Sequence, residues 1–232
     1  AEIGVCILGN VNHGHCSDER LQPVCEWLVR FKEELIDYMD YSHDEIRKAA
    51  VHRRPLGLGD SDLFHYLAKN KQFYNTKAGR NFIHKRLESR AFYMYQASIQ
   101  LAKEKGPCDW LHDTKYSEGW FTVDSYAPAL DIICDEPLHH DWEALRAEQI
   151  EHGQRHSTLF AVPPAGNSAK PSNSTSGIEA PRELLTIKDD KKVKTKQLVP
   201  DYHKYKNYYT TAWGDDFSNE EYFKTIGVVQ KF

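Results

Sequence analysis

Two stretches of the sequence carry groups that could do chemistry. One is a single thiol, Cys6, inside the apolar run from Glu2 to Val11. The other is a loop of small and polar residues at 164–168, with the sequence PAGNS. Short side chains leave backbone N–H groups uncovered, and Gly166 permits tight turns, so the loop can offer several N–H donors and the Ser168 hydroxyl to one anion. The alternatives are a buried structural thiol and an ordinary surface loop.

A predicted strand positions the loop. Apolar, β-branched and small residues alternate from His156 to Val162, which predicts a β-strand. Pro163 and Pro164 end it, because proline has no N–H to give to a sheet ladder. We expect the loop that follows to tighten into a helical turn. Before the strand, Asp141–His152 predicts a short helix that Gly153 ends.

Strands and helices alternate along the rest of the chain. The run around Cys6 predicts a strand buried on both faces. Apolar residues at three-to-four spacing predict helices at 18–41 and 76–105, the first with Asp18 as cap and a core-facing stripe of aromatic residues and methionine. A shorter helix is expected at 44–52, a capping box predicts one at 218–232, and 188–196 is expected to be a solvated hairpin tip. This alternation predicts an α/β fold with parallel strands.

Composition excludes several classes of protein. The 232 residues suit one large domain or two small ones, and 40% apolar with 28% charged residues is ordinary for a globular chain. A net charge of −4 gives no electrostatic reason to expect nucleic acid, and no apolar run suggests a membrane span. Five scattered cysteines favour a reducing, cytoplasmic location. The chain starts without methionine inside an expected strand, so we expect a piece of a longer polypeptide or of a split gene.

A histidine-rich stretch raises the question of a metal. His13, His15 and Cys16 stand together as HGHC. Zinc sites usually combine two ligand pairs at recognised spacings, and no second pair follows here. We therefore expect a turn with solvated histidines and no metal site.

The stretch from Asp141 to Arg182 resembles the large, catalytic subunit of class I ribonucleotide reductase. In that family a tryptophan-x-x-leucine helix and a glycine precede a basic, serine-threonine strand that ends in proline, and the next loop holds the substrate's phosphates. The matching residues are Trp142, Leu145, Gly153, Arg155, His156, Ser157, Thr158, Ala161 and Pro164, whereas Gln154 and Phe160 depart from the pattern. The bacterial loop reads proline-serine-glutamate-threonine-serine-serine. Here 164–169 read PAGNSA, so the acidic residue and two hydroxyls are replaced.

The resemblance implies a fold and a site. The fold would be the second half of a ten-stranded α/β barrel, with residues 1–232 a fragment of one domain. An arginine-arginine-x-leucine-glycine-x-glycine segment at 53–59 also matches. Cys6 would be one of two redox-active thiols, its partner lying upstream of this chain. The residues implied to hold the substrate's phosphates are Pro164, Ala165, Gly166, Asn167 and Ser168.

The resemblance also implies a reaction and partners. Ribonucleoside diphosphates would be reduced to deoxyribonucleotides for DNA synthesis, with a radical from a metal-containing small subunit and electrons from thioredoxin or glutaredoxin. No cofactor is expected in this chain itself. The family's asparagine-x-cysteine-x-glutamate triplet is absent, so the chain alone is expected to reduce nothing without the remaining part of the large subunit. The alternative is a non-catalytic barrel module that only binds phosphate or assembles with a partner.

Overall fold

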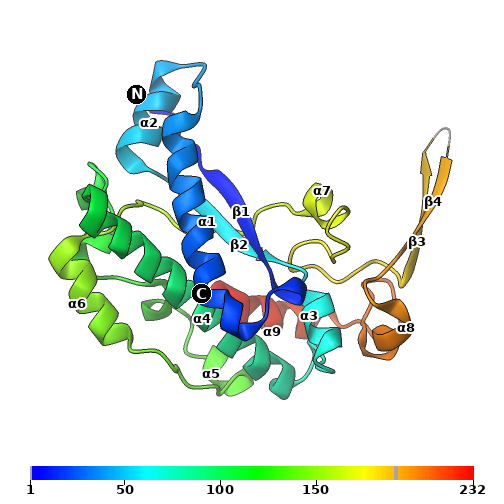
Figure 1. Cartoon of the computed structure of the whole chain (residues 1–232). Coiled ribbons are helices and arrows are strands. Elements are labelled where there is room, and N and C mark those ends of the chain that lie inside the picture. Colours follow the sequence, from blue (N-terminus) through cyan, green and yellow to red (C-terminus); the bar gives the residue numbers. More distant parts are fainter. Residues whose placement is uncertain (1, 191–192) are drawn as a thin grey trace.

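Two parallel strands form the centre of the molecule (Figure 1). The computed structural model describes residues 2–190 and 193–232. Strand β1 (Ile7–Asn12) pairs with β2 (Leu56–Ser61), in register from Ile7 opposite Leu56 to Asn12 opposite Ser61. The connection between them contains η1 (His13–His15), α1 (Asp18–Tyr38) and α2 (Asp44–Arg53). The prediction of an α/β fold with parallel strands is therefore confirmed.

The expected strand at 156–162 is only partly formed. Its chain runs parallel to β2, but the pairing reduces to a single bridge between Leu58 and Phe160. Leu56 N donates to Thr158 O, and Leu58 N donates to Leu159 O. In a regular parallel ladder, donors two residues apart bond to acceptors two residues apart. Here the acceptors are adjacent, so the ladder is irregular, although the segment still lies beside β2.

Strand β1 is more exposed than the sequence predicts. It begins at Ile7, so Cys6 lies immediately before it and is exposed. Ile3, Val5 and Leu8 are 49%, 37% and 42% exposed. Among the described residues β1 pairs with β2 alone, which leaves its other edge open. The prediction of a strand buried on both faces is wrong for this chain.

Helix α1 packs through a different face from the predicted one. Its core-facing residues include Leu21, Cys25 and Ile36, whereas Trp27 and Phe31 are 72% and 57% exposed. The buried stripe is displaced because it includes a carboxylate, Glu33, whose partners lie in the interior. The cap also differs, since the residue at the N-cap position is Ser17 rather than Asp18.

Three helices lie where the sequence predicts them: α4 (Lys77–Lys105), α6 (Trp142–His152) and α9 (Asn219–Gln230). Helix α3 (Leu63–Lys69) follows β2. Side chains of Thr76, Asp141 and Ser218 cap α4, α6 and α9 by accepting a backbone N–H three residues on. The capping box of α9 is only half formed, because the Glu221 carboxylate bonds to Arg80 and Lys224.

Shorter elements complete the chain. They are η2 (Leu111–Asp113), η3 (Lys115–Glu118), η4 (Thr122–Asp124), α5 (Leu130–Ile133), α7 (Gly166–Ala169), β3 (Leu185–Asp190), β4 (Val193–Leu198), α8 (Tyr202–Tyr205) and η5 (Lys206–Tyr208). The β3–β4 hairpin is antiparallel and extends away from the body of the molecule (Figure 1). The tip residues 191–192 of the expected solvated turn lie outside the described residues.

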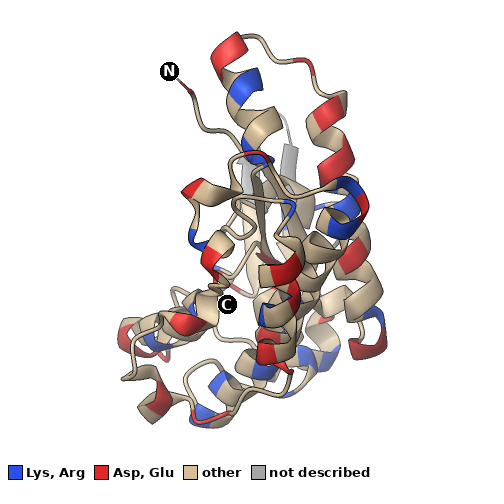
Figure 2. Cartoon of the chain, turned by 90° about the vertical axis from the view of Figure 1, so that its left-hand side faces the viewer, with Lys and Arg blue, Asp and Glu red and all other residues tan. Residues whose placement is uncertain are grey.

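Charges of both signs are interspersed over the helices, without a face of one sign in the view of Figure 2. Within the described residues, none of the helices combines the length and apolar character that crossing a bilayer requires. The same residues contain no closed barrel, since the parallel sheet has two strands and one isolated bridge.

Burial of His84 at the contact between α4 and the end of α9 makes stability depend on pH. The ring is 1% exposed, packs edge-on against Phe232 and has no hydrogen-bond partner among the described residues. Burial, with the Lys231 charge second, lowers the pKa of His84 to about 4. The unfolded chain, with a histidine pKa of about 6.5, then binds more protons between pH 6.5 and 4. Stability is therefore lost as pH falls through this window.

We predict that His84→Gln reduces this loss. Between pH 7 and 5.5 the unchanged protein should lose about 1 kcal/mol more unfolding free energy than the variant, because only the former carries this titration. Urea denaturation at the two pH values measures the difference. His112→Gln, at an exposed histidine, is the control and should behave like the unchanged protein. Equal losses in all three proteins would contradict the prediction.

Candidate active site

Two glycines of β2, Gly57 and Gly59, lie between Cys6 and the chain that enters the loop at 164–168. A Cβ at Gly57 would lie 3.1 Å from Cys6 Sγ and 3.2 Å from the Ala161 Cβ. A Cβ at Gly59 would collide with Ala161 O and Pro163 Cδ. Alternate residues of a strand point to the same side and advance about 7 Å, so Cys6 and Pro163 flank the same face of β2 a short distance apart. A Cβ at Gly57 would also collide with Leu8 Cδ2, so the two glycines allow Leu8, Cys6, Ala161 and Pro163 to pack closely against this face.

The loop forms the expected helical turn, but two of its details differ from expectation. Gly166 is not among the glycines with positive φ, so its special conformational freedom is not used. Ser168 Oγ donates to Ala165 O at 3.1 Å, so this hydroxyl closes the turn instead of pointing outward. Ala165 is buried, whereas Pro164 and Asn167 are exposed. The first amides of a helix have no acceptor inside the helix, which leaves the N–H groups at 166–168 as the loop's donors.

A cavity of about 460 Å³ adjoins the loop on the side of the β3–β4 hairpin. Of the five expected phosphate-binding residues, only Gly166 lines it. Its charged lining residues are Lys170, Glu179, Arg182 and Glu183, two of each sign. The cavity therefore has no net charge that would attract an anion, and the donors of the loop itself remain the anion-binding groups.

A buried carboxylate holds the segment that leads into the loop. Glu33 of α1 is fully buried and accepts from Arg54 Nε at 2.8 Å and from Arg155 Nε at 2.6 Å. His156 Nε2 lies 3.2 Å from the same carboxylate, and its Nδ1 lies 2.7 Å from Ser98 Oγ of α4. Two residues of the arginine-histidine-serine-threonine motif thus bind to α1 and α4. Their observed contacts are structural.

The charges of this network agree with its geometry. Burial raises the pKa of Glu33, but hydrogen bonds from His156 and Arg54 outweigh it and hold that pKa below its usual range. Burial lowers the pKa of His156, and Glu33 offsets only part of the effect. The stable arrangement is an ionised carboxylate with two guanidinium partners and a neutral imidazole.

A second buried network shows that the prediction of a turn with solvated histidines is wrong for His13. His13 is 1% exposed, and its Nε2 lies 2.7 Å from Asp60 Oδ1, which Arg90 also binds. Burial raises the pKa of Asp60, but the Arg90 charge and the His13 hydrogen bond lower it to about 2. Only His15 of the two histidines is exposed. The sequence did not reveal this network because Asp60 is 47 residues from His13.

Comparisons with known proteins assign the family. A sequence model described as the ribonucleotide reductase barrel domain matches residues 1–232. The chain is 38% identical over its whole length to the ribonucleoside-diphosphate reductase subunit alpha of Buchnera aphidicola from Schizaphis graminum, covering 30% of that protein. It is 41% identical over 197 residues, 85% of its length, to subunit alpha of ribonucleoside-diphosphate reductase 1 of Escherichia coli K12, covering 26% of it. The phage T4 subunit alpha is 33% identical over the whole chain, which covers 31% of it.

The fold and these matches define an α/β stretch of a reductase barrel domain. The chain belongs to the ribonucleotide reductase family, and it spans about 30% of the length of the alpha subunits that it matches along its whole length.

We predict that Glu33→Gln destabilises the protein by about 3 kcal/mol, because it leaves the largely buried Arg155 guanidinium without its counter-charge, whereas Arg54 keeps Asp37. Urea denaturation at pH 7 measures the free energy of unfolding. Glu34→Gln is the matched control: Glu34 is the next residue, is exposed and pairs with Lys105 on the surface, so the change should stay below about 1 kcal/mol. Similar effects of both substitutions would show that the Glu33 network does not hold the segment.

Proposed function

We propose that this chain forms the second half of the ten-stranded α/β barrel of a class I ribonucleotide reductase large subunit, one domain fragment over 1–232. One observation supports the proposal: Cys6 and the chain entering the loop flank the same face of β2, where Gly57 and Gly59 allow both to pack closely. A sugar bound beside Cys6 would contact the thiol at one end and direct its phosphates toward the loop at the other.

The proposed chemistry requires two thiols. Replacing the C2′–OH bond of the ribose by C2′–H, with loss of water, is a two-electron reduction. Two cysteine thiols supply both electrons by closing one disulfide, and an external dithiol, thioredoxin or glutaredoxin, reduces it again. Cys6 is one of the two thiols, and its exposure at the start of β1 supports this role. Its partner belongs to the remaining part of the large subunit.

The phosphates are assigned to the loop Pro164, Ala165, Gly166, Asn167 and Ser168. The amides at 166–168 donate, and each charge-assisted hydrogen bond contributes about 1.5–3 kcal/mol. Gly166 and Asn167 add no carboxylate that would repel the diphosphate. Ser168 takes part through its N–H, since its hydroxyl is engaged with Ala165 O.

Assembly with the rest of the large subunit completes the site. The open edge of β1, with exposed Ile3, Val5 and Leu8, supports a further strand and an apolar cover on this side. A small subunit with its metal centre supplies the radical, and the cytoplasm is the proposed compartment. The chain alone reduces nothing.

We predict that Cys6→Ser abolishes turnover in the large subunit reconstituted from this chain and its remainder. Multiple-turnover reduction of a ribonucleoside diphosphate with a dithiol reductant should fall at least a hundredfold, because no disulfide can close, while nucleotide binding is kept. Cys16→Ser, at another partly exposed thiol, is the control and should retain activity. Normal turnover by Cys6→Ser would favour the non-catalytic barrel module instead.

A second prediction concerns the phosphate loop. Asn167→Asp keeps the size of an exposed side chain and adds one negative charge beside the donating amides. We expect nucleoside diphosphate binding by the reconstituted subunit to weaken about tenfold, measured by isothermal titration calorimetry. Asn207→Asp, an exposed asparagine outside the loop, should leave the affinity unchanged. Equal affinity for Asn167→Asp and the unchanged protein would remove the loop from the phosphate site.

A further inference from the structure

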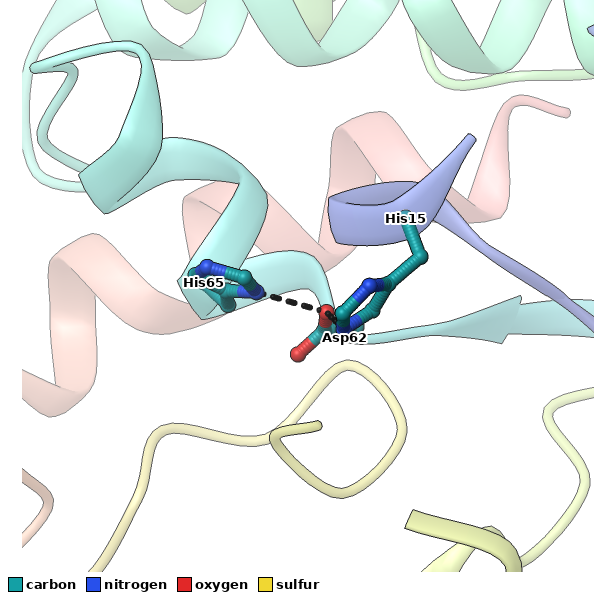
Figure 3. Close-up of side chains that lie close together, drawn as sticks. All are labelled: His15, Asp62 and His65. Carbon is teal, nitrogen blue, oxygen red and sulfur yellow. Dashed lines mark hydrogen bonds and ion pairs between the residues drawn. The ribbon is translucent and has the colours of Figure 1, made fainter. Parts of the chain in front are cut away.

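Three potential metal ligands meet beyond the carboxyl ends of β1 and β2. They are His15 in η1, Asp62 directly after β2, and His65 in the first turn of α3 (Figure 3). One ligand atom of each lies within 4.8 Å of the others. Asp62 Oδ2 is 2.8 Å from His65 Nδ1 and 3.8 Å from His15 Nε2. The parallel register of β1 and β2 brings the three residues together, although 50 residues separate His15 from His65.

The carboxylate is held with one oxygen facing the histidines. Asp62 is fully buried, and its backbone takes the left-handed conformation, with φ +65°. The N–H and the hydroxyl of Thr175 both donate to Oδ1. Oδ2 is thereby left to the two imidazoles. The orientation of this side chain is fixed before any ligand arrives.

Gly14 allows the chain before His15 to approach Asp62 and His65 closely. A Cβ at this position would collide with Asp62 Oδ2 and with His65 Nδ1. Any residue other than glycine would therefore displace the carboxylate or the ring. The close approach of η1 to the start of α3 depends on this glycine.

The Nε2 atom of His65 has surroundings typical of the ring nitrogen that does not bind the metal in a metal-ligating histidine. His65 is 2% exposed, and its Nε2 is buried without a hydrogen-bond partner among the described residues. Asp201 Oδ2 lies 3.4 Å away. Histidines that ligate metals usually donate their outer N–H to a carboxylate, which fixes the ring's orientation. A small approach of His65 Nε2 to Asp201 would satisfy both groups.

We propose that His15 Nε2, Asp62 Oδ2 and His65 Nδ1 bind a divalent transition metal ion of the zinc class, with Asp201 orienting His65. Two imidazole nitrogens and one carboxylate oxygen suit such ions. Tetrahedral ligands at zinc distances lie about 3.3 Å apart. The observed separations of 2.8 and 3.8 Å from Asp62 Oδ2 lie on either side of that value, and all three ligand atoms lie within 4.8 Å of one another, so modest side-chain shifts bring them around one ion.

Without a metal, both oxygens of the buried Asp62 carboxylate have hydrogen-bond partners: Thr175 at Oδ1, and His65 Nδ1 at Oδ2 at 2.8 Å. A dication bound between Oδ2 and Nδ1 would replace the second hydrogen bond by coordination and compensate the buried charge. His15 has a half-exposed side chain, and its Nε2 makes only a long contact, 3.4 Å, with Asn173 O. The exposed side leaves a fourth coordination position for water or an external ligand.

This site is independent of the proposed reductase function, since it uses neither Cys6 nor the loop at 164–168. The HGHC stretch alone predicted no metal site, because no second ligand pair follows it at a recognised spacing. Asp62 and His65 supply that pair from another part of the chain.

The test is metal binding by the purified full chain after treatment with chelator. Titration with Co²⁺, followed by its visible absorption and by competition with Zn²⁺, should show one ion per chain in a nitrogen and oxygen environment. His15→Ala, at an exposed side chain, should weaken the affinity at least tenfold while circular dichroism stays unchanged. His112→Ala is the matched exposed-histidine control and should bind like the unchanged protein.

Two further variants test whether Asp201 orients His65 and whether the Cys16 thiolate binds the metal instead. Asp201→Asn should weaken binding about ten- to a hundredfold, the range for removal of a group that orients a ligand. Cys16→Ser should keep both the affinity and the spectrum. Equal affinity for His15→Ala and the unchanged protein would overturn the proposal. So would a thiolate-to-cobalt band that disappears in Cys16→Ser.

Discussion

The buried carboxylate of Glu33 is the interaction on which the arrangement of the molecule depends. It joins α1, the residue after α2 and the segment entering the loop at 164–168, through Arg54, Arg155 and His156. A charge without water must be compensated by partners of good geometry, and these partners come from two other parts of the chain, at 54 and at 155–156. The network therefore specifies one arrangement of helices around β2. It also explains why α1 turns a face with a carboxylate inward and leaves Trp27 outside.

The geometry of the proposed substrate face follows from this arrangement. The network holds the segment 156–162 beside β2. Ala161 and Pro163 then pack against Gly57 and Gly59 from one side, and Cys6 packs from the other. A side chain at Gly57 or Gly59 would collide with Leu8 or with Ala161 and Pro163. Close packing at the two glycines, more than any ionisable group, places Cys6 and Pro163 on the same face of β2.

Local patterns in the sequence predicted much of the fold. The helix at 76–105 and the short helix before Gly153 have clear caps and periodicity, and the structure confirms both. The parallel pairing of β1 with β2 followed from the alternation of strands and helices. The family resemblance, carried by the residues around Trp142 and the loop, is also confirmed. These features depend on neighbours within a few residues or on a long shared motif.

What the sequence could not predict depends on distant partners. The buried face of α1 was misjudged because apolar periodicity gives no weight to an ion-paired Glu33. His13 was expected in solvent, but Asp60 and Arg90 bury it. The Ser168 hydroxyl was expected to point outward, but it bonds within its own turn. The roles of Cys6 and the phosphate loop remain proposals that rest on the resemblance and on their common face.

The most direct measurement is the separation between Cys6 Sγ and the ribose C2′ of a bound ribonucleoside diphosphate, in a crystal structure of the assembled large subunit. The account predicts van der Waals contact, about 3.5–4 Å, with the diphosphate on the amides at 166–168. A nucleotide bound with its phosphates elsewhere, or with the sulfur directed away from the sugar, would contradict it.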